Sequence, residues 1–421
     1  MSGLNPYALL RDLFATAVAA ADPMHVLPEV LPSRPVSGRV VVVGAGKASA
    51  RMAEAVESVW GPCEGLVITR YGYARPCQGI EIVEAAHPVP DAVGVAATQR
   101  MLTLLRGLGP QDFVLALLSG GGSALLCAPA EGLSLADKQA VTAALLASGA
   151  PIDRVNTVRK HLSAVKGGQL AAAAYPARML ALVISDVPGD DLAFIASGPT
   201  VGDTSPPAEA LRLLDDHAIA VPAAVHRHLR AGSGVLAPGA ETLSRCETRI
   251  IAAPAQSLQA AASLARSEGC AVRLLGDALE GEAADLGARL ARMARTYASA
   301  RRPDDAPLVL LSGGECTVSL PENPGSGGPN VEFLLSALLT LDGAPGVWAL
   351  AADTDGVDGA AEVAGAVIGP ETLARARMLG LDPARALAGH DAHRFFERLG
   401  AQVKPGPTLT NVNDFRAFLI H

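Results

Sequence analysis

Three consecutive glycines follow an apolar run in the stretch LALLSGGGSALL, residues 115–126. Glycine loses much backbone entropy on folding, so three in a row at the end of a buried strand need a reason. One reason is that bare backbone N–H groups let a phosphate approach closely. The alternative is a tight strand-to-helix turn without a ligand. On the first interpretation, the phosphate-binding residues are Ser119, Gly120, Gly121, Gly122 and Ser123.

A second apolar run, LVLLSGGECTVSL, also ends in Ser-Gly-Gly. In open α/β sheets, ligands bind in the loops at the carboxyl ends of the strands. This second turn therefore adds Gly313, Gly314 and Glu315 to the candidate nucleotide- or phosphate-binding residues. The two stretches belong to no fixed-period repeat, so a solenoid is not predicted.

The stretch VVVGAGKAS supplies Gly44 and Gly46 of a dinucleotide-binding fingerprint, but Ser49 stands where the third glycine belongs. The next apolar run ends in Arg70, whereas the fingerprint needs an acidic residue for the ribose. A Walker A loop is excluded because its first glycine is missing. What remains is Lys47 beside bare amides at a predicted helix N-terminus, a favourable place for phosphate or carboxylate. A surface lysine on a tight turn is the alternative.

The stretch RVNTVRKHLSAVKGGQL, residues 154–170, has the periodicity of one helix with a buried apolar stripe. A second stripe carries Asn156, Arg159, Ser163 and Lys166. Two cations and an amide on one face can grip an anion. An ordinary solvated helix face is the alternative.

Carboxylates gather after two apolar runs. VISDVPGDDLAFIASGPT places Asp186 at a predicted strand end and Asp190 next to a Pro-Gly turn. AADTDGVDGAAEVAGA places Asp353 and Asp355 in the same relation to another strand. Such carboxylates can hold Mg²⁺ or accept a proton from a hydroxyl group, whereas turn formation is the alternative. Near the C-terminus, GPTLTNVNDFRAFLI predicts a polar loop that ends in a helix cap.

Composition limits the class of protein. The chain has 421 residues, of which 50% are hydrophobic and 18% charged, with a net charge of −8. Its length predicts two or three well-buried domains. It contains no basic block for nucleic acid, no apolar run of membrane-spanning length and no signal peptide. Its six scattered cysteines form neither a zinc pattern nor a disulfide framework. We expect a soluble, cytoplasmic protein.

Short β-branched runs alternate with Ala- and Leu-rich helical stretches, which predicts an α/β protein. Most runs are apolar on both faces, as in parallel strands covered by helices. We expect two α/β domains, residues 1–235 with a Rossmann-like, mostly parallel sheet and residues 241–421, joined by a linker at 231–240. The expected strands are residues 39–46, 65–70, 112–120, 179–186, 248–254, 271–276, 307–314 and 347–355.

Several long strings occur in one fixed order, from VVVGAGKAS and AAHPVPD through LLSGGGSALL, NTVRKHLSAVKGGQLA and ISDVPGDDLAFIASGPTVGD to LLSGGE, DTDGVDG and GPTLTNVNDF. Together they resemble the glycerate 2-kinase family, also named hydroxypyruvate reductase, whose C-terminal half is a MOFRL-type domain. The resemblance covers nearly the whole chain. It implies ATP- and Mg²⁺-dependent phosphorylation of the C2 hydroxyl of D-glycerate to 2-phosphoglycerate, in a cleft between two α/β domains.

The resemblance also implies roles for individual residues. The expected catalytic residues are Lys47, which would face the phosphoryl group or the substrate carboxylate, Arg159, and Asp190. The expected substrate-binding residues are Asn156, Lys166, Asn330, Asn411 and Asn413. The expected metal ligands are Asp186, Asp353 and Asp355. The implied partner is a small hydroxy acid, and a homodimer is left open.

Two positions depart from the family pattern. Members usually carry arginine in a Gly-Gly-Arg-Asn-x-Glu string, where this chain has Pro329, and a small residue where it has Leu409. The substrate is therefore D-glycerate or a related small hydroxy acid. The alternative enzyme is an NAD(P)H-dependent hydroxypyruvate reductase, which the broken fingerprint disfavours although Arg70 suits a 2′-phosphate. A non-catalytic ligand-binding protein is a third hypothesis.

Overall fold

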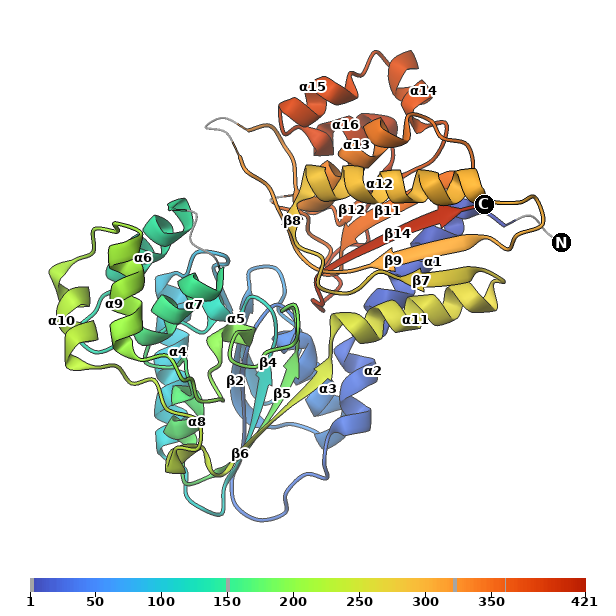
Figure 1. Ribbon diagram of the computed structural model, residues 1–421. Coiled ribbons are helices and arrows are strands. Elements are labelled where there is room, and N and C mark those ends of the chain that lie inside the picture. The colour runs from blue at the N-terminus through green and yellow to red at the C-terminus, as the bar shows by residue number, and fades with distance from the viewer. Residues whose placement is uncertain (1–3, 149–151, 321–323, 360) are drawn as a thin grey trace. The chain divides into compact units, whose positions relative to one another are not determined.

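The chain forms two compact units in the computed structural model, which describes residues 4–148, 152–320, 324–359 and 361–421 (Figure 1). The first unit is Pro23–Ile251, and the second joins Met1–Asp22 to Ala252–His421. This division differs from the expected one. The segment 231–240 lies inside the first unit, because the strand that follows it extends that unit's sheet.

The first unit contains a sheet in the order β3-β2-β1-β4-β5-β6. The strands from β3 to β5 pair in parallel, as expected for an α/β fold. The crossover direction reverses between β1 and β4, so these two neighbouring strands mark the switch point of the sheet. The strands are β1 (Val40–Ala45), β2 (Glu64–Arg70), β3 (Ile80–Ala85), β4 (Phe113–Leu118), β5 (Arg178–Ile184) and β6 (Cys246–Ala252).

Helices flank this sheet. Val41, Val43 and Ala45 of β1 belong to one core with α4 and α8, whereas α3, which follows β1, packs on the opposite face of the sheet. Alternate β-branched residues therefore serve two cores, which is why the run VVVV has no polar face. The helices are α2 (Pro23–Val30), α3 (Ser49–Trp60), α4 (Ala92–Arg106), α5 (Gly122–Leu125), α6 (Leu135–Ala147), α7 (Ile152–His161), α8 (Gln169–Ala174), α9 (Pro207–Asp216) and α10 (Ala223–Ala231), with short 3₁₀ turns at Ile195–Ser197 and Glu241–Leu243.

The single helix predicted over residues 154–170 is wrong in extent. Helix α7 ends at His161, and the chain turns before α8 begins. Gly167 and Gly168 have φ values of +57° and +83°, a left-handed backbone that interrupts a right-handed helix. Lys166 therefore leaves the helix face that carries Asn156.

The second unit contains a mixed sheet in the order β13-β12-β11-β14-β9-β7. Only β7 and β9 pair in parallel in this sheet of the described chain, and β14 runs antiparallel to both β9 and β11. The strands are β7 (Ala271–Leu274), β9 (Leu308–Ser312), β11 (Val347–Asp353), β12 (Gly365–Ile368), β13 (Gln402–Val403) and β14 (Asp414–Ile420), and a separate pair joins β8 (Gly281–Glu282) to β10 (Cys316–Thr317).

Each expected strand range corresponds to an observed strand, but the prediction for the C-terminus is wrong. The stretch expected to end in a helix cap forms β14, because its apolar residues fill a place between two strands far away in sequence. Sequence analysis also missed the strands β3, β8, β10, β12 and β13.

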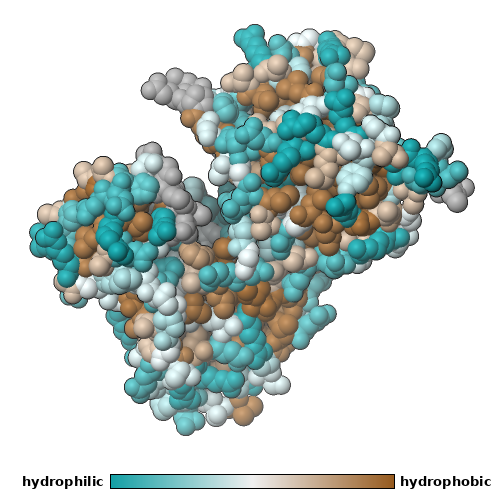
Figure 2. Space-filling view, in the orientation of Figure 1, coloured by the Kyte–Doolittle hydropathy of each residue, from teal (hydrophilic) through white to brown (hydrophobic). Residues whose placement is uncertain are grey.

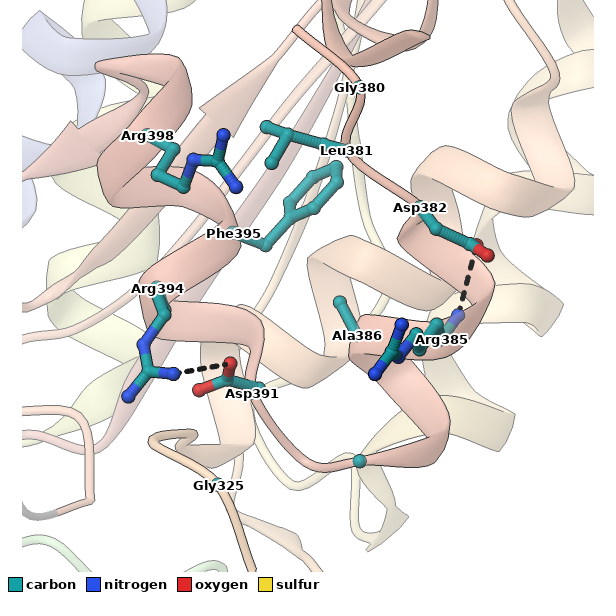
Figure 3. Close-up of a pocket in the computed structure, with 11 residues that line it drawn as sticks. Gly325, Gly380, Leu381, Asp382, Arg385, Ala386, Asp391, Arg394, Phe395 and Arg398 are labelled. Atoms are coloured by element: carbon teal, nitrogen blue, oxygen red, sulfur yellow. Dashed lines mark hydrogen bonds and ion pairs between the residues drawn. The ribbon is translucent and has the colours of Figure 1, made fainter.

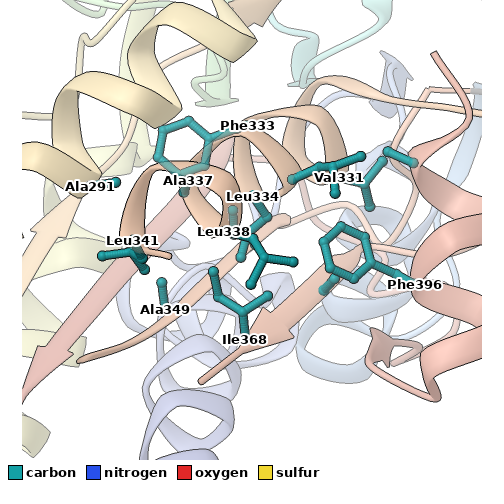
Figure 4. Close-up of a cluster of buried hydrophobic side chains, with 14 of the residues drawn as sticks. Ala291, Val331, Phe333, Leu334, Ala337, Leu338, Leu341, Ala349, Ile368 and Phe396 are labelled. Carbon is teal, nitrogen blue, oxygen red and sulfur yellow. The ribbon is translucent and has the colours of Figure 1, made fainter. Parts of the chain in front are cut away.

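Two cores cover the faces of the second sheet. One packs α12, α13 and α16 against the sheet, with Phe333 of α13 fully buried (Figure 4). The other packs α1 and α11 against the opposite face, which explains why the N-terminal helix belongs to this unit. The helices are α1 (Pro6–Ala19), α11 (Pro254–Ser267), α12 (Ala283–Ala300), α13 (Pro329–Leu341), α14 (Thr372–Met378), α15 (Pro383–Ala388) and α16 (Ala392–Leu399).

Hydrophilic and hydrophobic residues are interspersed over the face shown in Figure 2. No helix in the described part of the chain is both long and apolar enough to cross a membrane. All six cysteines are free, as their scattered positions in the sequence predict.

Candidate active site

The loops after β1 and β4 meet at the carboxyl edge of the first sheet, where the strand order reverses direction. Ligands of open α/β sheets bind at this kind of edge. The amide of Lys47 donates to the carbonyl of Gly120 at 2.8 Å, which joins the two loops. The sequence-predicted glycine loop, Ser119–Ser123, is therefore brought next to the predicted Lys47 turn.

Ser119 holds this junction together. It is fully buried, its Oγ accepts from the amide of Ala48 at 3.0 Å, and it lies 3.2 Å from Ser49 Oγ. A Cβ on Gly46 would come 2.1 Å from Ser119 Oγ, so glycine is required there. Because Ser119 is occupied with the loops, we assign it a positioning role and not the direct phosphate contact expected from the sequence.

Gly121 has the geometry expected of a phosphate cradle. Its φ of +78° is left-handed, and a Cβ there would lie 3.1 Å from the ring of His87 and from Cγ of Lys47. Within the described residues, the amides of Gly120 and Gly121 donate no hydrogen bond. Two bare N–H groups beside a lysine can bind phosphate oxygens.

His87 is a residue that the site assignment from sequence missed. It follows β3, and its imidazole borders Gly121. The signal in the sequence was AAHPVPD, in which His87 stands directly after a strand. Only the parallel order of β3, β2, β1 and β4 shows that this histidine reaches the glycine loop.

Lys166 is buried and does not face an open site. Its ammonium donates to the carbonyls of Ser123 at 2.9 Å, Leu126 at 3.3 Å and Ala196 at 3.4 Å. Burial holds the pKa of Lys166 well below its ordinary value. The ammonium thus ties α5, at the end of the glycine loop, to the segment after β5.

The segment after β5 has an unusual backbone. Ala196 and Ser197 have φ values of +51° and +63°, which side chains other than glycine adopt rarely. Ser197 Oγ lies 2.7 Å from Ser123 Oγ, so this backbone is held against the glycine loop. Strain of this kind persists where surrounding contacts fix it, and it is typical of functional sites.

Asp190 lies on the same segment, also with a positive φ of +56°. Its Oδ1 is buried and accepts no hydrogen bond from the described part of the chain. A buried carboxylate oxygen without a donor costs free energy unless a ligand, cation or proton reaches it. Asp186, at the end of β5, is half-buried.

Asn156 and Arg159 lie one turn apart on α7. Asn156 is buried, and its Oδ1 is 3.5 Å from Nη1 of Arg159. Arg159 has no ion pair among the described residues, and partial burial lowers the pKa of its guanidinium.

A buried lysine that sequence analysis missed, Lys138, donates to the carbonyl of Leu162 at 3.2 Å, and burial lowers its pKa to about 8.

A second cluster of predicted residues meets at one edge of the second sheet. Because β14 runs antiparallel between β9 and β11, its N-terminus lies beside their carboxyl ends, with Asp353 opposite Asp414 and Ser312 opposite Arg416. The loops carrying Gly313 therefore meet those carrying the predicted Asp and Asn residues. Sequence spacing alone could not reveal this.

Asp353 and Asp355 shape their own loop. Asp353 Oδ1 accepts from the amide of Asp355 at 2.9 Å, and Asp355 Oδ1 accepts from Val357 at 2.8 Å. Among the described residues, no three His, Cys, Asp or Glu side chains cluster so as to hold a metal ion. In this structure the two carboxylates therefore stabilise the turn after β11.

Asn411 and Asn413 are both buried at the start of β14. Asn411 Oδ1 accepts from the amide of Asn413 at 3.3 Å, and Thr354 Oγ1 donates to the carbonyl of Asn413 at 2.7 Å. The Nδ2 of Asn413 is buried and has no hydrogen-bond acceptor within the described ranges. Of these two predicted residues, Asn413 therefore has a donor available for a ligand.

Asn330 joins two buried carboxylates at the N-terminus of α13. Its Nδ2 donates to Asp414 Oδ1 at 2.6 Å, and its amide donates to Asp358 Oδ1 at 2.9 Å. Asp358 also accepts from the amide of Val331 at 3.0 Å. Burial raises the pKa of Asp358 to about 7, although these helix amides favour its charged form. We therefore assign Asn330 a positioning role, in place of the predicted substrate contact.

Arg416 is a fully buried cation that sequence analysis missed. Its Nη1 donates to the carbonyl of Gly313 at 3.0 Å, and its Nη2 contacts Asp414 and, at 3.1 Å, Cys316 Sγ. The guanidinium thus fixes the Gly313–Gly314 turn, while Glu315 next to it is exposed. The sequence feature that could have revealed Arg416 is its place as the one basic residue of the mostly apolar run DFRAFLI.

Pro329 takes the first position of α13, after Gly328 as N-cap. Proline suits this position because its missing N–H would have no partner within the helix. The departure from the family pattern is therefore accommodated locally, but it removes a cation from the helix start.

Two α/β units, each with glycine turns and buried polar groups at one sheet edge, are typical of an enzyme that binds a phosphorylated ligand. A family model described as a domain of unknown function (DUF4147) matches residues 9–230, and the MOFRL family model matches residues 308–414. The chain belongs to the glycerate 2-kinase family and is a kinase, as its similarity to known glycerate kinases shows.

The D-glycerate 2-kinase of Thermotoga maritima is 39% identical over 98% of each chain. A crystal structure of a glycerate kinase from Thermotoga maritima covers 99% of each chain with a TM-score of 0.87 and 38% identity. A putative hydroxypyruvate reductase of Agrobacterium vitis is 50% identical over 98% of this chain and 94% of its own length.

Proposed function

We propose that this chain transfers the γ-phosphoryl group of ATP to the C2 hydroxyl of D-glycerate and releases 2-phosphoglycerate. The observation that carries the proposal is the junction of the Lys47 turn with the glycine loop, on a chain related over its full length to a D-glycerate 2-kinase. Phosphoryl transfer requires mainly positioning and charge neutralisation from a protein.

The first unit supplies what such a transfer needs. The bare amides of Gly120 and Gly121 bind phosphate oxygens, and Lys47 neutralises charge as it moves to the leaving group. His87 borders the same cradle and donates a further hydrogen bond to a phosphate oxygen. Arg159, which has no ion pair among the described residues, adds positive field.

Asp190 is the group that we assign to the acceptor hydroxyl. Its buried Oδ1 has no hydrogen-bond donor among the residues that the structure describes, so a substrate hydroxyl can supply one and lose its proton there.

The carboxylates of the first unit can supply part of the coordination of Mg²⁺, and phosphates and waters would supply the rest. Magnesium in kinases is held by one or two carboxylates together with phosphates and waters. The half-buried carboxylate of Asp186 is of this kind, whereas no protein-only metal cage forms among the described residues. When bound, the ion would neutralise charge on the phosphate oxygens.

The test compares two assays on the purified chain. We expect ADP release that depends on D-glycerate and Mg·ATP, and no consumption of NADH or NADPH with hydroxypyruvate. Phosphorus NMR identifies the product, because a phosphate on C2 couples to one carbon-bound proton and a phosphate on C3 couples to two. Nicotinamide consumption without ADP release would instead assign the chain as a reductase.

A further inference from the structure

A pocket of about 540 Å³ lies in the second unit beside α15 and α16 (Figure 3). Three arginines line it, with Arg385 on α15 and Arg394 and Arg398 on α16. Its volume is in the range of small-molecule sites. None of these arginines belongs to the candidate active site described above.

The carboxylates in the pocket wall are already engaged by the backbone. Asp382 Oδ1 accepts from the amides of Ala384 and Arg385, each at 3.0 Å. Asp391 Oδ1 accepts from the amide of Ser326 at 3.0 Å. These contacts fix both carboxylates as parts of the wall.

The positive charge in the pocket exceeds what these carboxylates balance. Arg394 Nη1 lies 3.5 Å from Asp391 Oδ2, whereas Arg385 and Arg398 form no ion pair within the described residues. Arg394 and Arg398 are also one helical turn apart, where like charges destabilise a helix. A bound anion would relieve this repulsion.

The pocket floor between the arginines includes a small exposed part of two core side chains, Phe395 and Leu381. Phe395 is 4% exposed and Leu381 is 9% exposed, and both line the pocket. Figure 3 shows Phe395 on the same helix as Arg394 and Arg398, with Leu381 facing its ring. A ligand that fits has a charged end and a short carbon body.

We propose that this pocket binds a small organic phosphate, with its phosphate held by Arg385 and Arg398 and its carbon body against Phe395 and Leu381. Guanidinium groups suit this ligand because their planar forks donate pairs of hydrogen bonds to phosphate oxygens. The site is separate from the active-site cradle and does not depend on the proposed kinase activity.

The test is calorimetric titration of the full chain with 3-phosphoglycerate, inorganic phosphate and, as a control without phosphate, D-glycerate. We expect the Arg385→Ala/Arg398→Ala variant to raise the Kd for 3-phosphoglycerate at least tenfold. The single variant Arg398→Gln, which keeps a shorter, uncharged polar side chain, should give a smaller rise and guards against misfolding of the double variant.

Two controls separate the outcomes. Arg377→Ala removes an exposed arginine of the same unit that lies 3.7 Å from Asp342 and outside the pocket, and should leave the Kd unchanged. Lys47→Ala should likewise leave this binding event intact. The proposal is overturned if the double variant binds like the wild type, if Lys47→Ala abolishes the binding, or if phosphate and 3-phosphoglycerate bind equally well.

Discussion

The amide of Lys47 donates a 2.8 Å hydrogen bond to the carbonyl of Gly120, so the loops after β1 and β4 form one structural unit. Gly121 then presents its backbone between the Lys47 side chain and His87. The cradle therefore depends on a hydrogen bond between two backbones and on the absence of a side chain at one position.

Gly121→Val should abolish activity by filling this space. Gly132→Val is the matched control, because Gly132 has nearly the same φ, +79° against +78°, but a Cβ there would meet nothing within 4 Å. Both substitutions incur the left-handed backbone penalty of about 1–2 kcal/mol. Thermal melts should thus shift alike, while calorimetry should show weaker ATP binding only for Gly121→Val. Normal ATP affinity of Gly121→Val would show that the three glycines form only a turn and do not bind phosphate.

Lys47→Ala should lower kcat by about 100-fold or more, since removal of one transition-state donor has an effect of that order. The melting temperature should change little, because the loop junction uses the backbone amide of Lys47 and not its side chain. Lys404→Ala, which removes an exposed lysine of the second unit, is the control. Steady-state ADP release measures both, and an unchanged rate for Lys47→Ala would contradict the assignment.

Lys166→Met separates a positioning role from substrate binding. Loss of the three carbonyl contacts should loosen α5, so hydrogen exchange of the amides in Gly122–Leu125 should become faster. The value of kcat should fall while the KM for the hydroxy acid stays close to that of the wild type. A large rise in KM with unchanged hydrogen exchange would show that Lys166 binds substrate, as expected from the sequence.

Asp358→Asn should remove the decrease in the free energy of unfolding that the ionisation of Asp358 causes as the pH rises. Burial raises the folded-state pKa of Asp358 from 3.8 to about 7, so the folded chain binds more protons than the unfolded chain between these values. The stability that protonated Asp358 contributes is therefore lost as the pH rises through about 7. Two other titratable side chains lie near the carboxylate of Asp358. One is Asp414, whose pKa is also raised, and the other is His393, whose Nε2 lies 3.6 Å from Asp358 Oδ2.

The measurement is chemical unfolding of wild type and Asp358→Asn from pH 4 to pH 8. The stability difference, wild type minus variant, should fall from pH 4 to about pH 7 and level off above it. Asp112→Asn is the control, because backbone hydrogen bonds lower the pKa of Asp112, and its difference should stay flat above about pH 5. A flat difference for Asp358→Asn would show that Asp358 is ionised throughout.

Pro329→Arg restores the residue that family members usually carry. If D-glycerate is the substrate, we expect a several-fold lower KM for D-glycerate, because a cation returns to the start of α13. A small loss of stability should accompany it, since proline suits the first helical position. Initial rates with several small hydroxy acids measure this, and an unchanged preference would show that the chain does not need this arginine.

Local sequence was enough to predict the alternation of strands and helices and the places of the glycine turns. Runs such as VVVV at β1 have no polar face, so burial on both sides follows from composition, and a strand can be predicted without knowing its neighbours. Lys47 and the triple glycine were likewise visible, because anion-binding turns use local chemistry. The family resemblance rested on the same local strings, and the relatives confirm it.

Tertiary packing, by contrast, selects which predicted residues meet and which are free to bind. Lys166 and Asn330 were predicted to bind substrate, yet each is held by partners far away in sequence, which no local pattern encodes. The stretch ending in Ile420 became a strand because β9 and β11 leave a place between them. His87 and Arg416 gained their positions in the same way, since strand order and register arise from packing between segments that are distant in the sequence.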